Sequence, residues 1–285
     1  MKSFKIILQS SKLILLISLV NLIFFSSCTV ERQLSKDFQK YSDSVSVLVV
    51  GGSVLNKSSL VIAQLYPQFN ELSPDLQDTV WKHQTKFLDV VSDSMLLELY
   101  YESVLQKLKK TKIKVYNDSQ TSEFLKQSGA KWIFRVGQIQ LEEDKQKVDF
   151  SAEIKNQEEL YKNLEIEVLS LNVWLEMFKS ENDTAPEKIF YTQKTISDEV
   201  DGRFFSTDEN ETYEFRYKRT DLTKDDLIKL AKVTGELNAQ QIVDYLFTQY
   251  IKRFYPESEK FYGFDIDKQY FYTPNEKDQF IEVKK

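Results

Sequence analysis

The chain has 285 residues and a formal net charge of −6, and 13% of its residues are aromatic. An acidic chain offers no basic field to attract phosphates, which argues against nucleic acid as a partner. With only seven glycines and five prolines, the composition is that of a folded protein and argues against disorder.

The N-terminal segment has the three parts of a secretory signal. Early lysines precede an apolar run over residues 13–25, and two serines then precede Cys28, the only cysteine. This order resembles the lipobox of bacterial lipoproteins, although Phe25 stands where leucine is usual. The resemblance implies that residues 1–27 are a signal peptide and that lipid on Cys28 anchors the protein to the outer membrane, facing the periplasm or the surface.

An uncleaved membrane anchor and a plain signal peptide are the alternatives for this segment. The apolar run has 13 residues, which is short of the roughly 20 that cross a bilayer, so cleavage is favoured. Cleavage removes three lysines (Lys2, Lys5 and Lys12) and takes the net charge from −6 to −9. With Cys28 carrying lipid, no cysteine remains for a disulfide.

Patterning divides the mature chain into three parts. Residues 28–43 are polar without an apolar period, which predicts a tether that could reach about 50 Å when fully extended. Residues 44–255 have the strand and helix patterns of one α/β domain. Residues 256–285 form a C-terminal tail rich in aromatic and charged residues.

The first half of the domain mixes strands and helices. Residues 45–50 are a nearly continuous apolar run, which predicts a strand covered on both faces. Helices are predicted from Pro74 and over residues 97–108, where apolar residues recur at helical spacing. A short strand over 113–116, a short helix closed by Gly129 and a long strand with a bulge at Gly137 follow.

The second half is predicted to be antiparallel. Apolar residues alternate up to Val168 and then change phase from Leu169, which predicts a bulge between them. Residues 189–200 form a further strand, and residues 202–205 and 213–217 flank a polar hairpin tip.

A helical region follows Thr223, which forms a capping-box pattern with Asp226. Its two apolar stripes are about 120° apart on a straight helix, which predicts a kink or break at residues 235–238. The fold class is therefore α+β, a mixed sheet with helices on one face, an antiparallel second half and a C-terminal helical region. The residues predicted to be buried are Trp132, Phe134, Val168, Val173, Ile242 and Leu246.

Reactive side chains are few. His83 is the only histidine, and no nucleophile elbow accompanies it, so no Ser-His-Asp triad is recognisable. No Cys and His cluster could hold zinc, and Gly51-Gly52 lacks the lysine and serine of a phosphate loop. We therefore assign no catalytic residue, cofactor or metal ligand, and we predict that the protein is not an enzyme.

Carboxylates leave one enzymatic alternative, an acid-pair hydrolase acting on envelope glycans. Residues 142–144 are expected to form a solvated turn after a strand that ends near Leu141, and Asp265 and Asp267 lack the glycine and glutamate of an EF-hand. An enzyme of this kind needs a concave pocket with two converging carboxylates of raised pKa, which a scaffold does not need.

Residues 130–137 (Ala-Lys-Trp-Ile-Phe-Arg-Val-Gly), after a short capped helix, resemble a recurrent step of periplasmic α/β domains. Such domains occur in the curli-secretion lipoprotein, the N-terminal domain of the Tol-system propeller protein and the lipoprotein activators of penicillin-binding proteins. The similarity covers roughly Val45 to Leu175. It implies binding or assembly in place of catalysis, and it carries over no functional residues.

These inferences favour a lipid-anchored, non-catalytic binding or assembly factor of the bacterial cell envelope. Its expected partners are the membrane, through lipid on Cys28, and an envelope protein. The aromatic stretch from Phe261 to Tyr272 is expected to pack across its own domain, and it is also the best candidate for an exposed contact surface.

Overall fold

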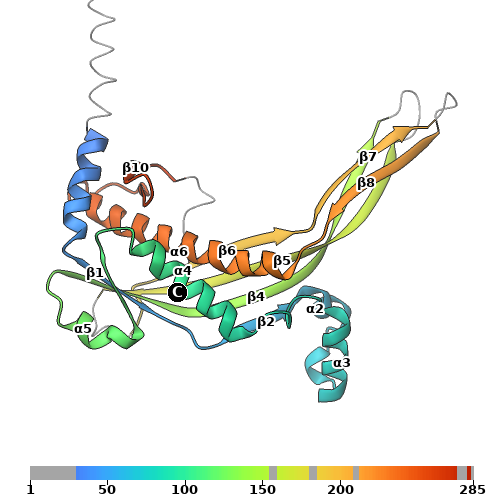
Figure 1. The fold of residues 1–285 in the computed structure, drawn as a ribbon, viewed down its shortest axis with the longest axis horizontal. Coiled ribbons are helices and arrows are strands. Elements are labelled where there is room, and N and C mark those ends of the chain that lie inside the picture. The colour runs from blue at the N-terminus through green and yellow to red at the C-terminus, as the bar shows by residue number, and fades with distance from the viewer. Residues whose placement is uncertain (1–29, 154–158, 180–184, 208–211, 275–280, 284–285) are drawn as a thin grey trace, which may run out of the picture.

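The computed structural model describes residues 30–153, 159–179, 185–207, 212–274 and 281–283, so the signal segment and Cys28 lie outside the described residues. Figure 1 shows a body of helices on a sheet, from which a long β arm projects. A smaller projection carries α2 (Leu60–Leu65) and α3 (Pro74–Gln84). The helix formed by residues 30–42 stands at the end of the body away from the arm.

The main sheet of the described chain has the order β11-β6-β5-β4-β1-β3, and β2 also pairs with β4. Strand β1 is parallel to β3 and β4, and β2 is parallel to β4, whereas β4, β5, β6 and β11 are antiparallel in turn. This mixed sheet confirms the predicted α+β class. The bounds are β1 (Val45–Val50), β2 (Leu55–Ser59), β3 (Lys114–Asn117), β4 (Ala130–Ala152), β5 (Leu160–Phe178), β6 (Lys188–Ser197) and β11 (Ile281–Glu282).

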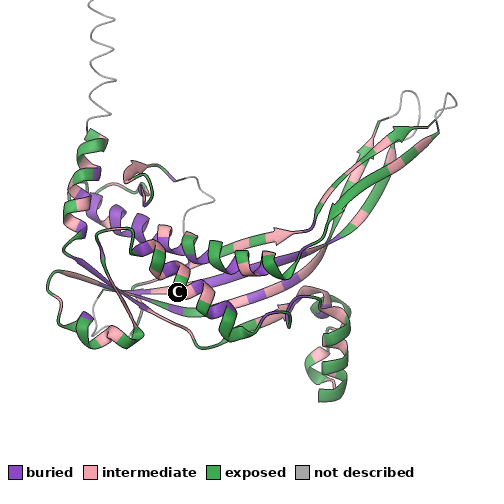
Figure 2. Ribbon diagram, in the orientation of Figure 1, coloured by how far each residue is buried: buried purple, intermediate pink, exposed green. Residues whose placement is uncertain are grey.

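Two long helices, α4 (Asp93–Leu108) and α6 (Lys224–Lys252), pack against each other over one face of this sheet. The core lies between these helices and the strands, where Figure 2 shows buried residues along α6, β4 and β5. The short helix α5 (Thr121–Leu125) packs on β1 and β3. The residues predicted to be buried are all buried, namely Trp132, Phe134, Val168, Val173, Ile242 and Leu246.

The arm combines the distal parts of β4 and β5 with a separate two-stranded sheet, β7 (Glu199–Ser206) and β8 (Tyr213–Thr220). The rings of Phe150 and Phe215 join the two layers, with centroids 5.2 Å apart. Gly202 leaves room for this contact, because a Cβ there would lie 2.5 Å from the Phe215 ring. The predicted hairpin is confirmed, and its tip at residues 208–211 lies outside the described residues.

The apolar phase of β5 changes without a bulge, so the bulge predicted near Val168 and Leu169 is wrong. The register of β4 and β5 is continuous there and shifts only at Gly137 within the described pairs, where a bulge was predicted. The odd-numbered residues 169–175 belong to the core under the helices, whereas the even-numbered residues 164–168 share the face of Phe150, where β8 packs. The apolar phase of β5 therefore changes because the helices cover one face of the sheet and the β7–β8 layer covers the opposite face.

Residues 30–42 form a helix packed on the domain, so the prediction of an extended tether is wrong. Phe38 is 2% exposed, and its ring lies 4.9 Å from that of Phe247 on α6. The hydroxyl of Ser35 accepts a hydrogen bond of 2.9 Å from the main-chain N–H of Phe271 in the tail. A helix of this length reaches only about 20 Å, which is less than half the reach expected of a tether.

Helix α6 runs unbroken from Lys224 to Lys252, so the break predicted at residues 235–238 is wrong. The capping box of Thr223 and Asp226 opens the helix as predicted. Its central turns have packing partners on several sides. Tyr245 meets Trp132 of the sheet, and Asn238 accepts a hydrogen bond of 2.8 Å from the Tyr100 hydroxyl of α4. Both apolar stripes are therefore buried on one straight helix.

Gly235 lies where α6 meets α4 most closely. A Cβ at this position would lie 2.4 Å from the Tyr100 carbonyl oxygen and 2.9 Å from the Ser103 Cβ. The absence of a side chain is therefore what allows the two helices to approach.

We predict that Gly235→Ala destabilises the protein, although alanine is favoured over glycine by about 1 kcal/mol inside a helix. Overpacking against the α4 backbone costs about 1–3 kcal/mol, which outweighs that gain. Urea unfolding measures the difference, with Glu236→Ala at the exposed neighbouring position as the control. A G235A protein more stable than wild type would contradict the packing described.

Candidate functional site

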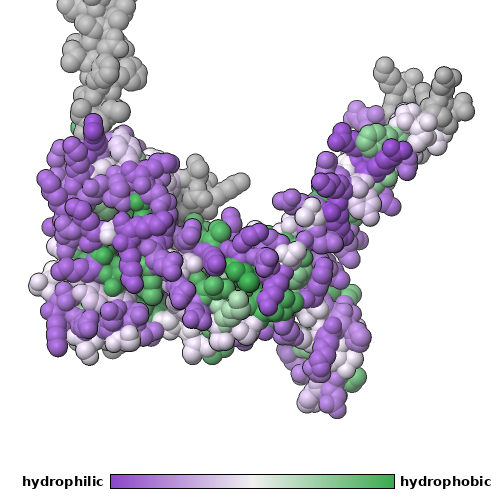
Figure 3. Space-filling view, in the orientation of Figure 1, coloured by the Kyte–Doolittle hydropathy of each residue, from purple (hydrophilic) through white to green (hydrophobic). Residues whose placement is uncertain are grey.

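A groove of about 420 Å³ lies at the root of the arm, between the beginning of α6 and the end of strand β6. Figure 3 shows apolar surface gathered near this end of α6. We call it the open-edge groove. It is lined by residues of β6, of the arm root and of α6, namely Lys194, Ile196, Ser197, Glu199, Thr220, Asp221, Leu222, Asp226, Lys229, Leu230 and Val233.

The groove has an apolar floor and a charged rim. Leu222 and Leu230 are buried, whereas Val233 is 45% exposed and offers apolar surface to solvent. On the rim, the carboxylate of Asp226 is occupied as the helix cap, because it accepts hydrogen bonds from Thr223 and Lys229. The Thr223 and Lys229 hydrogen bonds lower the pKa of Asp226, so it stays ionised. Such a surface suits an apolar ligand group with polar neighbours.

One buried carboxylate, that of Asp198, fixes the shape of this region. Its side chain is fully buried at the corner where β6 passes into β7. It accepts hydrogen bonds from the main-chain N–H groups of Glu167 on β5, at 2.9 Å, and of Leu222, at 2.7 Å. The guanidinium of Arg219 on β8 donates a third, at 2.6 Å. These hydrogen bonds hold the groove residues of the β6–β7 corner next to the residues that lead from β8 into α6.

The pKa of Asp198 reflects two opposing effects. Burial alone would raise it, but the hydrogen bonds from the two main-chain N–H groups and the ion pair with Arg219 together lower it below its ordinary value. The carboxylate is therefore ionised in the folded protein at neutral pH.

The edge of β6 beside the groove lacks a strand partner among the described residues. Strand β11 pairs with this edge only at Phe190 and Tyr191, and the main-chain N–H of Val283 bonds to the Ile189 carbonyl. Because main-chain groups alternate along a strand, those of Gln193 and Thr195 point off the sheet on the same side. Both residues are exposed. We call residues 193–197 the open edge of β6.

The described part of the tail after Pro256 packs on the domain. Phe264 and Ile266 are buried, and the strands β9 (Gly263–Asp265) and β10 (Tyr270–Tyr272) form a small hairpin beside α6. This agrees with the expectation that the stretch from Phe261 to Tyr272 packs on its own domain, and it disfavours the stretch as a contact surface.

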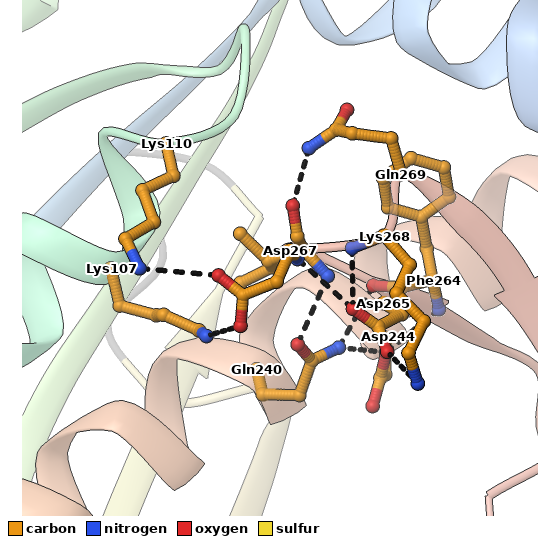
Figure 4. A network of polar contacts seen from close by, with 10 residues as sticks. Lys107, Lys110, Gln240, Asp244, Phe264, Asp265, Asp267, Lys268 and Gln269 are labelled. Carbon is orange, nitrogen blue, oxygen red and sulfur yellow. Dashed lines mark hydrogen bonds and ion pairs between the residues drawn. The ribbon is translucent and has the colours of Figure 1, made fainter.

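Figure 4 shows the polar network that fastens this hairpin. The carboxylate of Asp244 on α6 accepts hydrogen bonds from Gln240, from the Phe264 N–H and from the Tyr272 hydroxyl. Burial raises the pKa of Asp244 to about 7, against the lowering effect of these hydrogen bonds. Asp267 forms ion pairs with Lys107 and Lys110 of α4. The network is thus satisfied within the chain and joins the hairpin to both long helices.

The predicted solvated turn at residues 142–144 is wrong, because β4 continues to Ala152. Glu143 is 1% exposed, and its carboxylate accepts hydrogen bonds of 2.7 and 2.9 Å from the N–H groups of Lys86 and Phe87. It holds the segment before α4 against the sheet. Sequence reasoning missed this role, although the apolar phase of Ile139 and Leu141 continues to Glu143.

Two carboxyl groups of the described chain have raised pKa values, and they belong to different regions. Burial raises the pKa of Glu167, and nearby Glu143 raises it further while Lys145 lowers it. The other group is Asp244 in the tail network. Neither lines the open-edge groove. The arrangement required of an acid-pair hydrolase is therefore not what this groove provides.

Other sequence candidates have ordinary surroundings in the structure. His83 is exposed on α3. The N–H groups of Gly51 and Gly52 are already bonded to the Asp118 carboxylate and the Tyr101 hydroxyl, so they do not form a phosphate cradle. Within the described ranges, no group of three metal-ligating side chains is found, and no helix is long and apolar enough to cross a membrane.

Comparisons with known proteins give little guidance. Neither a protein-family model nor a curated protein sequence matches the chain. The chain is similar to the crystal structure of a neuraminyllactose-binding hemagglutinin homolog from Helicobacter pylori, with 10% identity over 77% of this chain and 94% of that chain and a TM-score of 0.30. At this level, the similarity supports no conclusion about the function of the chain.

Proposed function

We propose that the protein is a lipid-anchored, non-catalytic binding or assembly factor of the bacterial cell envelope, which holds a polypeptide partner in the open-edge groove. The observation that carries this proposal is an apolar groove beside a strand edge that has no partner among the described residues, at the root of the arm. Both features are unfavourable to leave exposed and favourable to cover with a partner.

The packing of residues 30–42 on the domain would restrict how far the domain stands from a lipid anchor and how it is oriented. Lipid on Cys28 would lie two residues before this helix, which Phe38 and Ser35 fix to α6 and to the tail hairpin. The domain would then stand within about 20 Å of the membrane in a restricted orientation. Confinement at the membrane raises the effective concentration of a partner in the same envelope, so high intrinsic affinity is not required.

The chemistry of the groove favours binding over catalysis. Asp226 is committed to the helix cap, and Asp221 accepts a hydrogen bond from Arg219. The groove has no histidine or cysteine in its lining, and neither Glu167 nor Asp244, the carboxyl groups with raised pKa values, lines it. A hydrolase acting on envelope glycans remains the alternative, and it would require a site other than this groove.

The anchor is tested by Cys28→Ala in the full-length protein. Because the thiol of Cys28 is the only cysteine sulfur available for acylation, we expect fatty-acid labelling to disappear and the protein to leave the membrane fraction. Equal labelling of wild type and C28A, or a mature N-terminus elsewhere by mass spectrometry, would contradict the anchor.

The groove is tested by Val233→Glu, which places a charge on its exposed apolar wall. Leu76→Glu is the matched control, since Leu76 is 54% exposed on α3, away from the groove. A photo-cross-linking residue in place of Lys194 reports contact with a partner in living cells. We expect the same polypeptide adduct in wild type and L76E and its loss in V233E, with unchanged thermal stability in all three.

An adduct that persists in V233E at the wild-type level would contradict a role for the groove. An adduct to glycan in place of polypeptide would favour the hydrolase alternative.

A further inference from the structure

We propose that the partner enters as an extended strand, which pairs with the open edge of β6 and places an apolar side chain in the open-edge groove. The proposal rests on the proposed function and specifies how the groove recognises its partner. The occupant is a segment of about five residues from another polypeptide, with apolar residues at alternate positions.

The main chain of the open edge supplies the first part of the argument. The carbonyl of Ile189 bonds to β11, which shows that odd-numbered residues of β6 turn their main-chain groups to this side. The N–H of Asp198 bonds to Glu167 on β5, as expected if even-numbered residues turn the other way. Gln193 and Thr195 therefore present donors and acceptors to solvent at strand spacing, a pattern that an extended chain satisfies.

Strand β11 shows that this edge accepts an added strand. Ile281 lies opposite Tyr191 and Glu282 lies opposite Phe190, in antiparallel register. An incoming strand would continue an interface that the protein already uses. Because β11 runs antiparallel to β6, the chain after Val283 leads away from Gln193. Residues 275–280, which precede β11 on the side of Gln193, lie outside the described residues, and the hydrogen-exchange experiment below distinguishes them from a partner strand.

The groove supplies selectivity for the side chains of the added strand. Lys194 and Ile196 of β6 line the groove, so the face of β6 that bears them is the face covered by α6. Alternate residues of a paired strand project on that same face. An apolar residue there would meet Ile196, Leu230 and Val233, whereas the residues between would face solvent on the other side of the sheet.

The size of the site favours a peptide segment over a second copy of the chain. Five residues of edge extend about 17 Å. A stable dimer buries about 800 Å² on each partner, which needs a broad surface. The site consists of one short strand edge and a groove with a volume of about 420 Å³. An extended segment of another polypeptide matches both the length and the hydrogen-bonding pattern.

Amide hydrogen exchange of the full-length, acylated protein in detergent micelles tests the proposal. The probe is a terminally blocked hexapeptide of alternating valine and threonine at about 1 mM, and the same peptide N-methylated at every second residue is the control. We expect the unmodified peptide to protect the Gln193 and Thr195 amides and the N-methylated peptide to leave them unprotected. The comparison does not alter the protein.

A protein variant provides the second measurement. Thr195→Pro removes an N–H that points off the sheet and leaves the β5 ladder intact, as proline is tolerated at such edge positions. Thr195→Val keeps the N–H and is the matched control. We expect T195P to weaken peptide binding about fivefold or more and T195V to leave it unchanged, because each lost hydrogen bond is worth about 1 kcal/mol.

Three results would overturn strand addition: no protection at millimolar peptide, equal protection by the two peptides, or equal binding by T195P and T195V. Protection of the Gln193 and Thr195 amides in the absence of peptide would also overturn the proposal. The occupant would be a second copy if that protection rises with protein concentration, and the chain's own residues 275–280 if it does not. If the Lys194 adduct still depends on Val233 in that case, the proposed function stands and only the recognition mode fails.

Discussion

The buried carboxylate of Asp198 is the interaction on which the arm and the groove both depend. It sits where β6 becomes β7, and it binds the N–H groups of Glu167 and Leu222 and the guanidinium of Arg219. Three segments distant in sequence are thus fixed to one point. The groove is lined by residues on either side of this corner, so the hydrogen bonds to Asp198 help to position its walls.

A buried charge of this kind is stable only when its hydrogen-bonding capacity is filled. The Asp198 carboxylate meets that condition with two main-chain donors and one cation. Charge-assisted hydrogen bonds are stronger than neutral ones and more directional than apolar contacts. A rigid corner of this sort can project a long arm from the body and still hold the adjoining edge of β6 in a fixed position.

Local patterns in the sequence predicted the elements well. The apolar run at residues 45–50, the Pro74 helix start, the Thr223 capping box and the bulge at Gly137 are all present. These features depend on neighbouring residues, which a sequence shows directly.

The wrong predictions share one physical cause. Apolar periodicity reports which side chains are buried but not what buries them. In β5 the apolar phase changes because β7 and β8 cover one face of the strand and the helices cover the other. In α6 both apolar stripes are buried because the sheet, α4, the tail and the helix of residues 30–42 surround it. The polar pattern of residues 30–42 likewise concealed a helix that contributes mainly Phe38 to the core.

The candidate site could not be predicted because no motif encodes it. Its lining comes from three stretches between Lys194 and Val233, and the open edge follows from the strand order of the sheet. The sequence pattern placed Asp198 inside a single strand over residues 189–200, and this prediction is wrong because the chain turns a corner there between β6 and β7. Only the folded chain shows that its side chain is buried and fully bonded.

The most direct test of this account is the free energy of unfolding of wild type and Asp198→Asn, measured by urea between pH 7 and pH 3. The lowered pKa of Asp198 means that its ionised form stabilises the fold above its ordinary value of 3.8, and that this contribution is lost as the pH falls through the folded-state pKa. The account predicts that wild type is more stable by about 2 kcal/mol at pH 7, since hydrogen bonds to a charge are lost in the variant, and that the difference shrinks below pH 3.8. Equal stabilities at pH 7, or a difference that does not change with pH, would contradict it.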